Sequence, residues 1–238
     1  MPDAQLLVFA RCLGFVFRAP AFSHPDVPPP LRAGFAYVLS LALAHAWGAT
    51  AHAGGNFVVA VASEALVGAA IGTAASVLYD GAYAGGRALD DYVGIRASVP
   101  SANVAAGAGF GRLWSLAFAA AFFALGGYRI ALEGFADTFR TLPPGVFVAA
   151  TGLQTFGIAL PQTLLRAALF VAGPAIAIGL VAQFGLAVVA RVVPRFSTFT
   201  LAFPVVFACV LLVTIASLPF VLQAGAAPWW DLAPLRGR

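Results

Sequence analysis

Long stretches without a charged residue constrain this chain more than any other feature of its sequence. Residues 167–190 and 197–223 contain no Asp, Glu, Lys or Arg, and each stretch exceeds the roughly 20 residues that a helix needs to cross a bilayer. Only 9% of all residues are charged and 61% are hydrophobic, whereas soluble domains carry about 25% charged residues. The sequence therefore predicts an integral membrane protein.

Shorter apolar runs extend this pattern to the N-terminus. Candidate helices fall at residues 6–22, 33–50, 57–79, 113–125, 146–161, 167–190 and 197–223. The run 146–161 is short and contains glycine, which favours a half-span or a re-entrant segment. No alternation of polar and apolar residues typical of strands competes with helices. We expect an all-α membrane protein of five to seven hydrophobic helices, forming a single domain over residues 1–238.

The charged residues do not orient the chain in the usual way. All thirteen basic residues are Arg, and cytoplasmic loops are normally rich in such residues. The basic loop RVVPR (residues 191–195) and the basic tail with Arg236 and Arg238 are separated by one apolar run, which would place them on opposite sides. The segments 80–96 and 128–142 carry charges of both signs that cancel nearly or completely. This pattern predicts that some apolar helices do not cross the bilayer in a conventional manner.

Residue types that catalyse reactions or bind metals are scarce. His24, His45 and His52 form no pair spaced for metal binding. The distant Cys12 and Cys209 lie in apolar runs, as expected for small buried residues rather than a disulfide. No nucleophile elbow, P-loop or dinucleotide-binding motif occurs. The Arg residues are scattered and do not form a nucleic-acid-binding stripe. We expect neither enzymatic activity nor a cofactor or metal.

Three acidic residues stand out by their positions. Glu64 lies inside the apolar run 57–79, where a charge is costly. It is either a proton or ion relay, or a structural carboxylate facing a neighbouring helix or subunit. On the structural interpretation, we expect Glu64→Gln to be nearly silent and Glu64→Leu to weaken assembly. Asp90 and Asp91, with Arg87 and Arg96 nearby, predict an ion-pair network at a helix end.

Small residues are arranged for close contact between helices. GAAIG (residues 68–72) and GAYAG (residues 81–85) both have the G-x-x-x-G spacing that lets two backbones approach in a membrane. The stretch GIRASVPSANVAAGAGFGR (residues 94–112) is different, because between its two Arg residues it is uncharged and almost free of large side chains. Such a stretch is either a helix N-terminus packed against a neighbour or a pliable loop.

Three segments resemble a known family in order and spacing. They are EALVGAAIGTAASVLYDGAYAGG (64–86), ALEGFADTFRTLPPG (131–145) and IALPQTLLRAALFVAGPAIAIGLVAQFGLAVVARVVPRFSTFTLAFPV (158–205). The chain is similar to the export-apparatus protein of bacterial flagella and type III secretion injectisomes, the FliR/SctT family. This resemblance implies a multi-pass protein of the inner membrane without enzymatic activity, whose helices form hairpins in a helical, hetero-oligomeric export gate. Its implied partners are two sister membrane proteins, an export switch protein, secreted unfolded proteins and lipid.

The resemblance also implies roles for parts of the chain. Residues 1–95 supply N-terminal helices, 96–111 a plug loop, 112–223 C-terminal helices and 224–238 a short tail. The implied plug residues are Arg96, Ser98, Val99, Pro100, Ser101, Asn103, Gly107, Gly109 and Gly111. The expected subunit-interface residues are Glu64, Gly68, Gly72, Asp90, Asp91, Arg112, Asp137, Arg140, Pro143, Arg191 and Pro194.

Two main functions therefore remain open from the sequence. The first is a subunit of the export gate, with the injectisome branch slightly favoured over the flagellar one by Gly126-Gly127, although DTFRTLP (residues 137–143) is closer to the flagellar branch. The second is a polytopic small-molecule transporter or channel with Glu64 as its coupling carboxylate. A third is a membrane structural protein without a pore.

Overall fold

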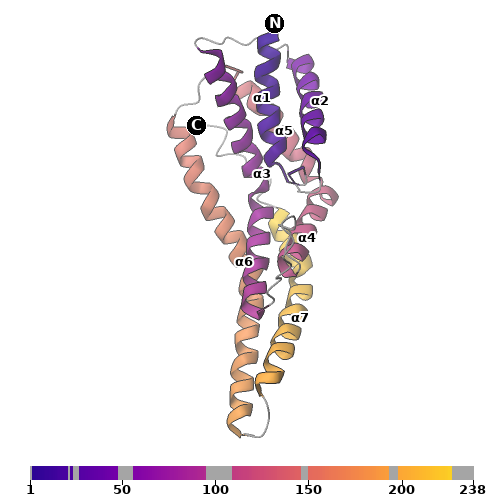
Figure 1. Ribbon diagram of the computed structural model, residues 1–238, viewed down its shortest axis with the longest axis vertical. Coiled ribbons are helices and arrows are strands. Elements are labelled where there is room, and N and C mark those ends of the chain that lie inside the picture. The colour runs from indigo at the N-terminus through magenta and orange to yellow at the C-terminus, as the bar shows by residue number, and fades with distance from the viewer. Residues whose placement is uncertain are drawn as a thin grey trace. The chain divides into compact units, whose positions relative to one another are not determined.

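The computed structural model describes residues 2–20, 22–23, 27–47, 56–94, 109–145, 150–192 and 198–226. These residues form α1 (Pro2–Arg18), α2 (Pro29–Trp47), α3 (Phe57–Val93), α4 (Phe110–Ala124), α5 (Gly127–Thr141), α6 (Ala150–Val192) and α7 (Thr198–Ala226) (Figure 1). No strand occurs in this part of the chain. The prediction of an all-α membrane protein is confirmed.

Several helices extend beyond the apolar runs that predicted them. α3 continues past residue 79 through its charged residues to Val93, because charge does not stop a helix whereas Gly94, with φ 84°, does. The charge-balanced segment 128–142 is mostly the helix α5. The prediction of a separate half-span over 146–161 is wrong for residues 150–161, since they join the next apolar run in the 43-residue helix α6. The prolines inside α6 do not interrupt it, and membrane helices commonly tolerate proline.

Three helices are long and apolar enough to cross a membrane. They are Phe57–Val93, Ile158–Val192 and Ala202–Val221, and the bent pair α4–α5 would be a fourth if it counts as one span. Helix α7 contains Pro204 and Pro219, which would be costly inside a helix surrounded by water. The length and composition of these helices support the description of the chain as a membrane protein.

The described chain divides into two compact units, each with its own packing. The first unit contains residues up to Val77 and Phe122–Gln162, and the second contains Leu78–Ala121 and Thr163–Ala226. The continuous helices α3 and α6 contribute to both units. Each unit is described separately below.

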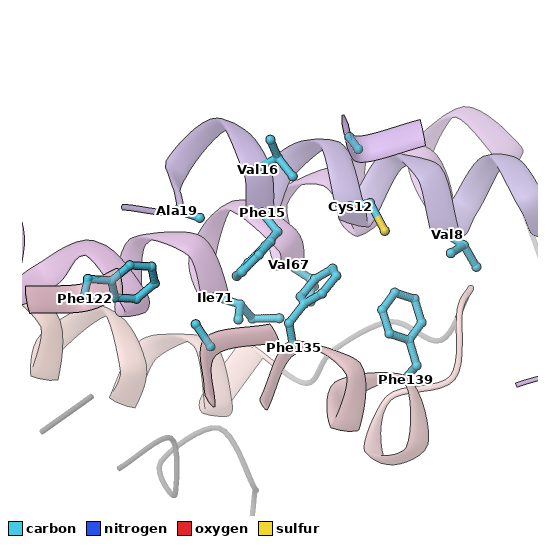
Figure 2. Packing of buried hydrophobic residues seen from close by; sticks show 12 residues of the cluster. Val8, Cys12, Phe15, Val16, Ala19, Val67, Ile71, Phe122, Phe135 and Phe139 are labelled. Atoms are coloured by element: carbon cyan, nitrogen blue, oxygen red, sulfur yellow. The ribbon is translucent and has the colours of Figure 1, made fainter. Parts of the chain in front are cut away.

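The first unit is built around the amphipathic helix α1. Pro2 and Asp3 suit its first turn and Arg18 its last, and Pro20 follows where the helix can no longer continue. Its buried face packs against α3 and α5 (Figure 2). The rings of Phe15 and Phe135 stack with centroids 4.2 Å apart, and burying one such side chain is worth about 1.5–3 kcal/mol.

The second unit depends on close contact between α3 and α6. A Cβ added at Gly81 would lie 2.6 Å from the Cβ of Ala167, and one added at Gly85 would lie 2.6 Å from the carbonyl oxygen of Ala168. The motif GAYAG therefore packs helix against helix as predicted. α7 returns alongside α6 (Figure 1), with the rings of Phe170 and Phe220 6.1 Å apart.

Candidate structural and gate residues

A buried ion pair lies at the centre of the first unit. Arg11 of α1 donates a hydrogen bond from Nε to Oε2 of Glu64 on α3, with 2.5 Å between the two atoms. The two side chains are 1% and 2% exposed, respectively. Of the two structural alternatives for Glu64, a neighbouring helix or a subunit, the structure places its carboxylate against a helix of the same chain.

The same pair holds the turn that follows α5. Nη1 of Arg11 donates to the carbonyl oxygen of Leu142 at 2.9 Å and to that of Thr138 at 3.4 Å. The backbone N–H of Gly145 donates to Oε1 of Glu64 at 2.9 Å. The two residues between Leu142 and Gly145 are prolines and have no N–H to donate. Arg11 and Glu64 thus bind the LPPG turn at its first acceptor and its last donor.

Aromatic packing completes the surroundings of Arg11. Its Cζ lies 4.5 Å from the ring centroid of Phe139, a geometry that favours a cation. The guanidinium also lies at the C-terminus of α5, where carbonyl groups lack partners within the helix and a positive charge is stabilised. The structure leads us to predict that Glu64→Gln is not silent, because a neutral side chain would leave the charge of Arg11 buried and uncompensated.

Arg11 is the important residue that the sequence did not assign to a site. The signal was present, since Arg11 and Glu64 are both charged residues within apolar runs. Ionisable residues in such surroundings generally pair with one another. Their separation by 53 positions hides the contact from any argument based on local spacing.

The first glycine motif brings α3 against α1. A Cβ at Gly68 would collide with the backbone of Arg11, and one at Gly72 would lie 2.5 Å from the carbonyl oxygen of Phe15. Both glycines, predicted for a subunit interface, thus serve a contact within the chain. Their close approach also brings Arg11 within reach of Glu64.

In the second unit, Asp90 caps the start of α4. Its buried carboxylate accepts hydrogen bonds from the backbone N–H of Phe110 at 2.7 Å and of Gly111 at 3.2 Å. These amides have no partners within α4, and a negative charge is favourable at that end. Among the described residues, the carboxylate of Asp90 therefore binds backbone amides, where an ion-pair network with Arg side chains was predicted. Arg96, a predicted member of that network, lies outside the described residues.

Two glycines with positive φ lie near the ends of the predicted plug, residues 96–111. Gly94 has φ 84° and Gly109 has φ 114°, a region that favours glycine. The N–H of Gly94 donates to the carbonyl oxygen of Asp90 at 3.0 Å, so one residue contacts the chain on both sides of the segment. A Cβ at Gly111 would lie 3.0 Å from the side chain of Arg87. Ser98, Val99, Pro100, Ser101, Asn103 and Gly107 lie outside the described residues.

The remaining predicted interface residues are at the surface. Asp91 and Arg112 are exposed, and Arg140 lies 3.7 Å from Asp137 on the outer side of α5. Pro143 and Arg191 are exposed as well, whereas Pro194 lies outside the described residues. Whether these residues contact another subunit stays a prediction.

The described polar side chains of these sites hold helices and turns in place. Among the described residues, no group of three or more His, Cys, Asp and Glu side chains is placed to hold a metal ion. Cys12 and Cys209 are not bonded to each other. The polar side chains of Glu64, Arg11 and Asp90 bind backbone groups and one another, which fixes helices and turns.

Comparison with known proteins gives a consistent result. The sequence model of the family described as "Bacterial export proteins, family 1" matches residues 3–228. The chain is also 25% identical over 224 residues to the "Flagellar biosynthetic protein FliR" of Aquifex aeolicus (strain VF5). That similarity covers 91% of this chain and 85% of the relative.

Proposed function

The chain belongs to family 1 of the bacterial export proteins, and on this premise we propose that it is a core subunit of the inner-membrane export gate of a type III protein secretion system. In this role it is a multi-pass membrane protein that forms part of the pore through which unfolded proteins leave the cytoplasm. Its contribution is structural, and the chain does not catalyse a reaction.

The apolar surface of α6 and α7 is the observation that carries this proposal. In each of the candidate spans Ile158–Val192 and Ala202–Val221, only 22% of the most apolar stretch of 18 residues is buried within the chain. Their outer sides expose large apolar residues, among them Leu169, Val181, Phe184, Val188, Leu212, Ile215 and Phe220. Such a surface requires lipid or protein to cover it, and a gate built from several hydrophobic chains supplies both.

We propose that the covering proteins are two sister export-apparatus membrane proteins, joined by an export switch protein. Helices that are apolar around their whole circumference belong in lipid or in the interior of an assembly. The described surface of α7 has this character, since its exposed residues between Ala202 and Val221 are almost all apolar. The secreted proteins are the transient partners that pass through the gate.

The segment 96–111 is the proposed plug of the closed pore. Its sequence is small-featured and nearly uncharged, which suits a segment that must fill a lumen and also leave it. Support comes from its two ends, because Gly94, just before it, and Gly109, inside it, both adopt positive φ. The backbone N–H groups of Gly94 and of Phe110, next to Gly109, both donate to Asp90. A plug anchored at fixed ends can be displaced without unfolding the helices beside it.

The branch of the secretion system is part of the proposal. The sequence slightly favours an injectisome, whereas the relative from Aquifex aeolicus carries a flagellar name. Identity of 25% does not separate two branches of one family. Restoration of motility or of effector secretion in a strain that lacks this gene distinguishes them.

The alternative function as a transporter loses its main support. A coupling carboxylate must exchange a proton or ion with water or substrate. Glu64 is 2% exposed, and its two oxygens accept hydrogen bonds from Arg11 and Gly145. This geometry suits a structural role for Glu64, and no contact of Glu64 among the described residues favours transport.

Deletion of the gene from its own organism tests the proposal. We expect export substrates to disappear from the medium while they accumulate inside the cell, and the full chain supplied in trans should restore them. Normal protein secretion by the deletion strain would overturn the proposal. Solute uptake by the purified chain alone in liposomes would overturn it in favour of a transporter.

A further inference from the structure

Arg166 is an isolated charge on the apolar helix α6. It lies within the candidate span Ile158–Val192, and the other charged residue of this helix, Arg191, lies in its last turn. The side chain of Arg166 is exposed, and Leu165 and Leu169 beside it are 59% and 62% exposed. A charge on such an apolar surface is costly unless a group of opposite charge or water meets it.

The two helices that form this surface contain no carboxylate of their own. No Asp or Glu occurs between Asp137 and Asp231, a stretch that includes all of α6 and α7. Among the described residues, the side chain of Arg166 forms no ion pair and no hydrogen bond. The described chain therefore leaves this charge uncompensated.

The packing of α6 directs Arg166 away from α3. The positions of α6 that meet the glycines of α3 are Ala167, Ala168 and Val171. At 3.6 residues per turn, Arg166 lies roughly 150° around the helix axis from the mean direction of these three positions. Rotation of α6 would break the close contacts with α3. Arg166 is thus held on the side of α6 where another molecule can approach.

A second copy of this chain is poorly suited to compensate Arg166. Apart from Asp3 and Asp91, every described acidic side chain already has a partner in the chain. Asp3 lies in the first turn of α1 and Asp91 in the last turn of α3, so neither lies midway along an apolar helix. A carboxylate from a different chain is the better match.

The position of Arg166 along α6 favours a carboxylate over a lipid phosphate. Arg166 lies about 12 Å along the helix axis from the start of the candidate span at Ile158, and farther from its end. Lipid headgroups lie at the two ends of a span, beyond the reach of this side chain. A neighbouring helix can place a carboxylate at any depth, and the planar guanidinium binds it through two parallel hydrogen bonds.

We propose that Arg166 forms an ion pair with an Asp or Glu that lies within an apolar helix of a neighbouring, unlike subunit. The inference rests on the proposed function, because that function supplies the unlike subunits. Apolar contacts alone tolerate a shift of one helix along another. A single charge pair among them fixes the register, since a shift would leave both charges unpaired.

Substitutions at position 166 test the inference through the amount of complex on native gels. Arg166→Met should reduce the complex at least about tenfold, because it leaves the carboxylate of the neighbour buried without a counter-charge. Arg166→Lys keeps the charge but loses the planar fork, so its complex should be intermediate in amount. The control Arg129→Met removes an Arg that is 77% exposed and paired with Glu133, and it should leave the complex unchanged.

Tolerance of Arg166→Met would overturn the inference. In lipid or against a purely apolar chain, Met is more favourable than Arg, so the amount of complex would stay the same or rise. Unchanged assembly of Arg166→Met with loss of a bound phospholipid in native mass spectrometry would assign the residue to a lipid phosphate. That result would overturn the inference as well.

Charge exchange identifies the partner and excludes a simple folding defect. Arg166→Glu is combined, one change at a time, with replacement of each Asp and Glu in the helices of the co-purifying chains by Arg. We expect one such change to restore the complex that each single variant loses. Absence of any restoring change, or restoration by Asp3→Arg or Asp91→Arg in this chain, would overturn the inference. Failure of the proposed function is recognised separately, by normal secretion from the deletion strain.

Discussion

Replacing Glu64 by Gln should severely destabilise the first unit, although the change removes little more than a charge. The carboxylate uses both oxygens, one for Nε of Arg11 and one for the N–H of Gly145. A Gln side chain offers one oxygen and one NH₂ group, so one of these two donors would face another donor. The charge of Arg11 would also remain buried without a counter-charge.

The magnitude follows from this burial. Breaking a buried ion pair by removal of one partner costs about 3–5 kcal/mol, which lowers the folding equilibrium constant roughly a hundred- to several-thousand-fold. The assay is the fraction of chain that remains folded and assembled after stepwise heating in mild detergent, followed on native gels. We expect Glu64→Gln to lose its native band well below the temperature at which the unaltered protein loses it.

Two further variants make the experiment decisive. Glu133→Gln removes the same charge from an ion pair with Arg129 that is exposed to the surface, and it should behave like the unaltered protein, since exposed pairs contribute little. The double variant Arg11→Met/Glu64→Gln should be less destabilised than the sum of its single variants, because no unpaired charge remains. Equal thermal loss for Glu64→Gln and Glu133→Gln, or strict additivity, would refute the reasoning.

Three other perturbations test the remaining contacts. Asp90→Ala leaves two buried amides of α4 without acceptors, each worth about 1–3 kcal/mol, so hydrogen exchange at these amides should accelerate. Asp91→Ala, at the exposed neighbour, should leave their exchange unchanged, and equal effects would contradict the assignment of the cap. Gly85→Ala places a Cβ 2.6 Å from a carbonyl oxygen of α6 and should lower thermal stability. The control Gly173→Ala places its Cβ in open space and should leave thermal stability unchanged. A larger loss of stability for Gly173→Ala than for Gly85→Ala would contradict the proposed helix contact. Deletion of residues 98–108 should make the assembled complex leak ions in a planar bilayer, and unchanged conductance would argue against the plug.

The sequence predicted the membrane environment and the helical fold because both follow from local composition. An uncharged run such as residues 197–223 has few alternatives to an apolar helix. The helix ends were less predictable. α3 extends to Val93 because its charged residues lie on a helix that continues within the second unit, and no local signal distinguishes that from an ordinary loop.

The candidate site was predicted only in part, because its contacts join distant segments. Glu64 stood out as a charge in an apolar run, but its partner Arg11 comes from another helix and its second donor, Gly145, from a proline turn. The two glycine motifs did predict close helix contacts, although not which helices they meet. Asp90 was expected to pair with Arg side chains, whereas its carboxylate accepts hydrogen bonds from two backbone N–H groups at the start of α4.

Composition of the native complex tests the central claim most directly. The chain carries a small affinity tag, is expressed at its natural level, and is purified in mild detergent for native mass spectrometry. If unlike chains cover the apolar surfaces of α6 and α7, the tagged protein emerges with two other small hydrophobic membrane proteins in a fixed ratio. A stable monomer that carries only detergent and lipid, and keeps its fold on heating as the complex does, would contradict the account.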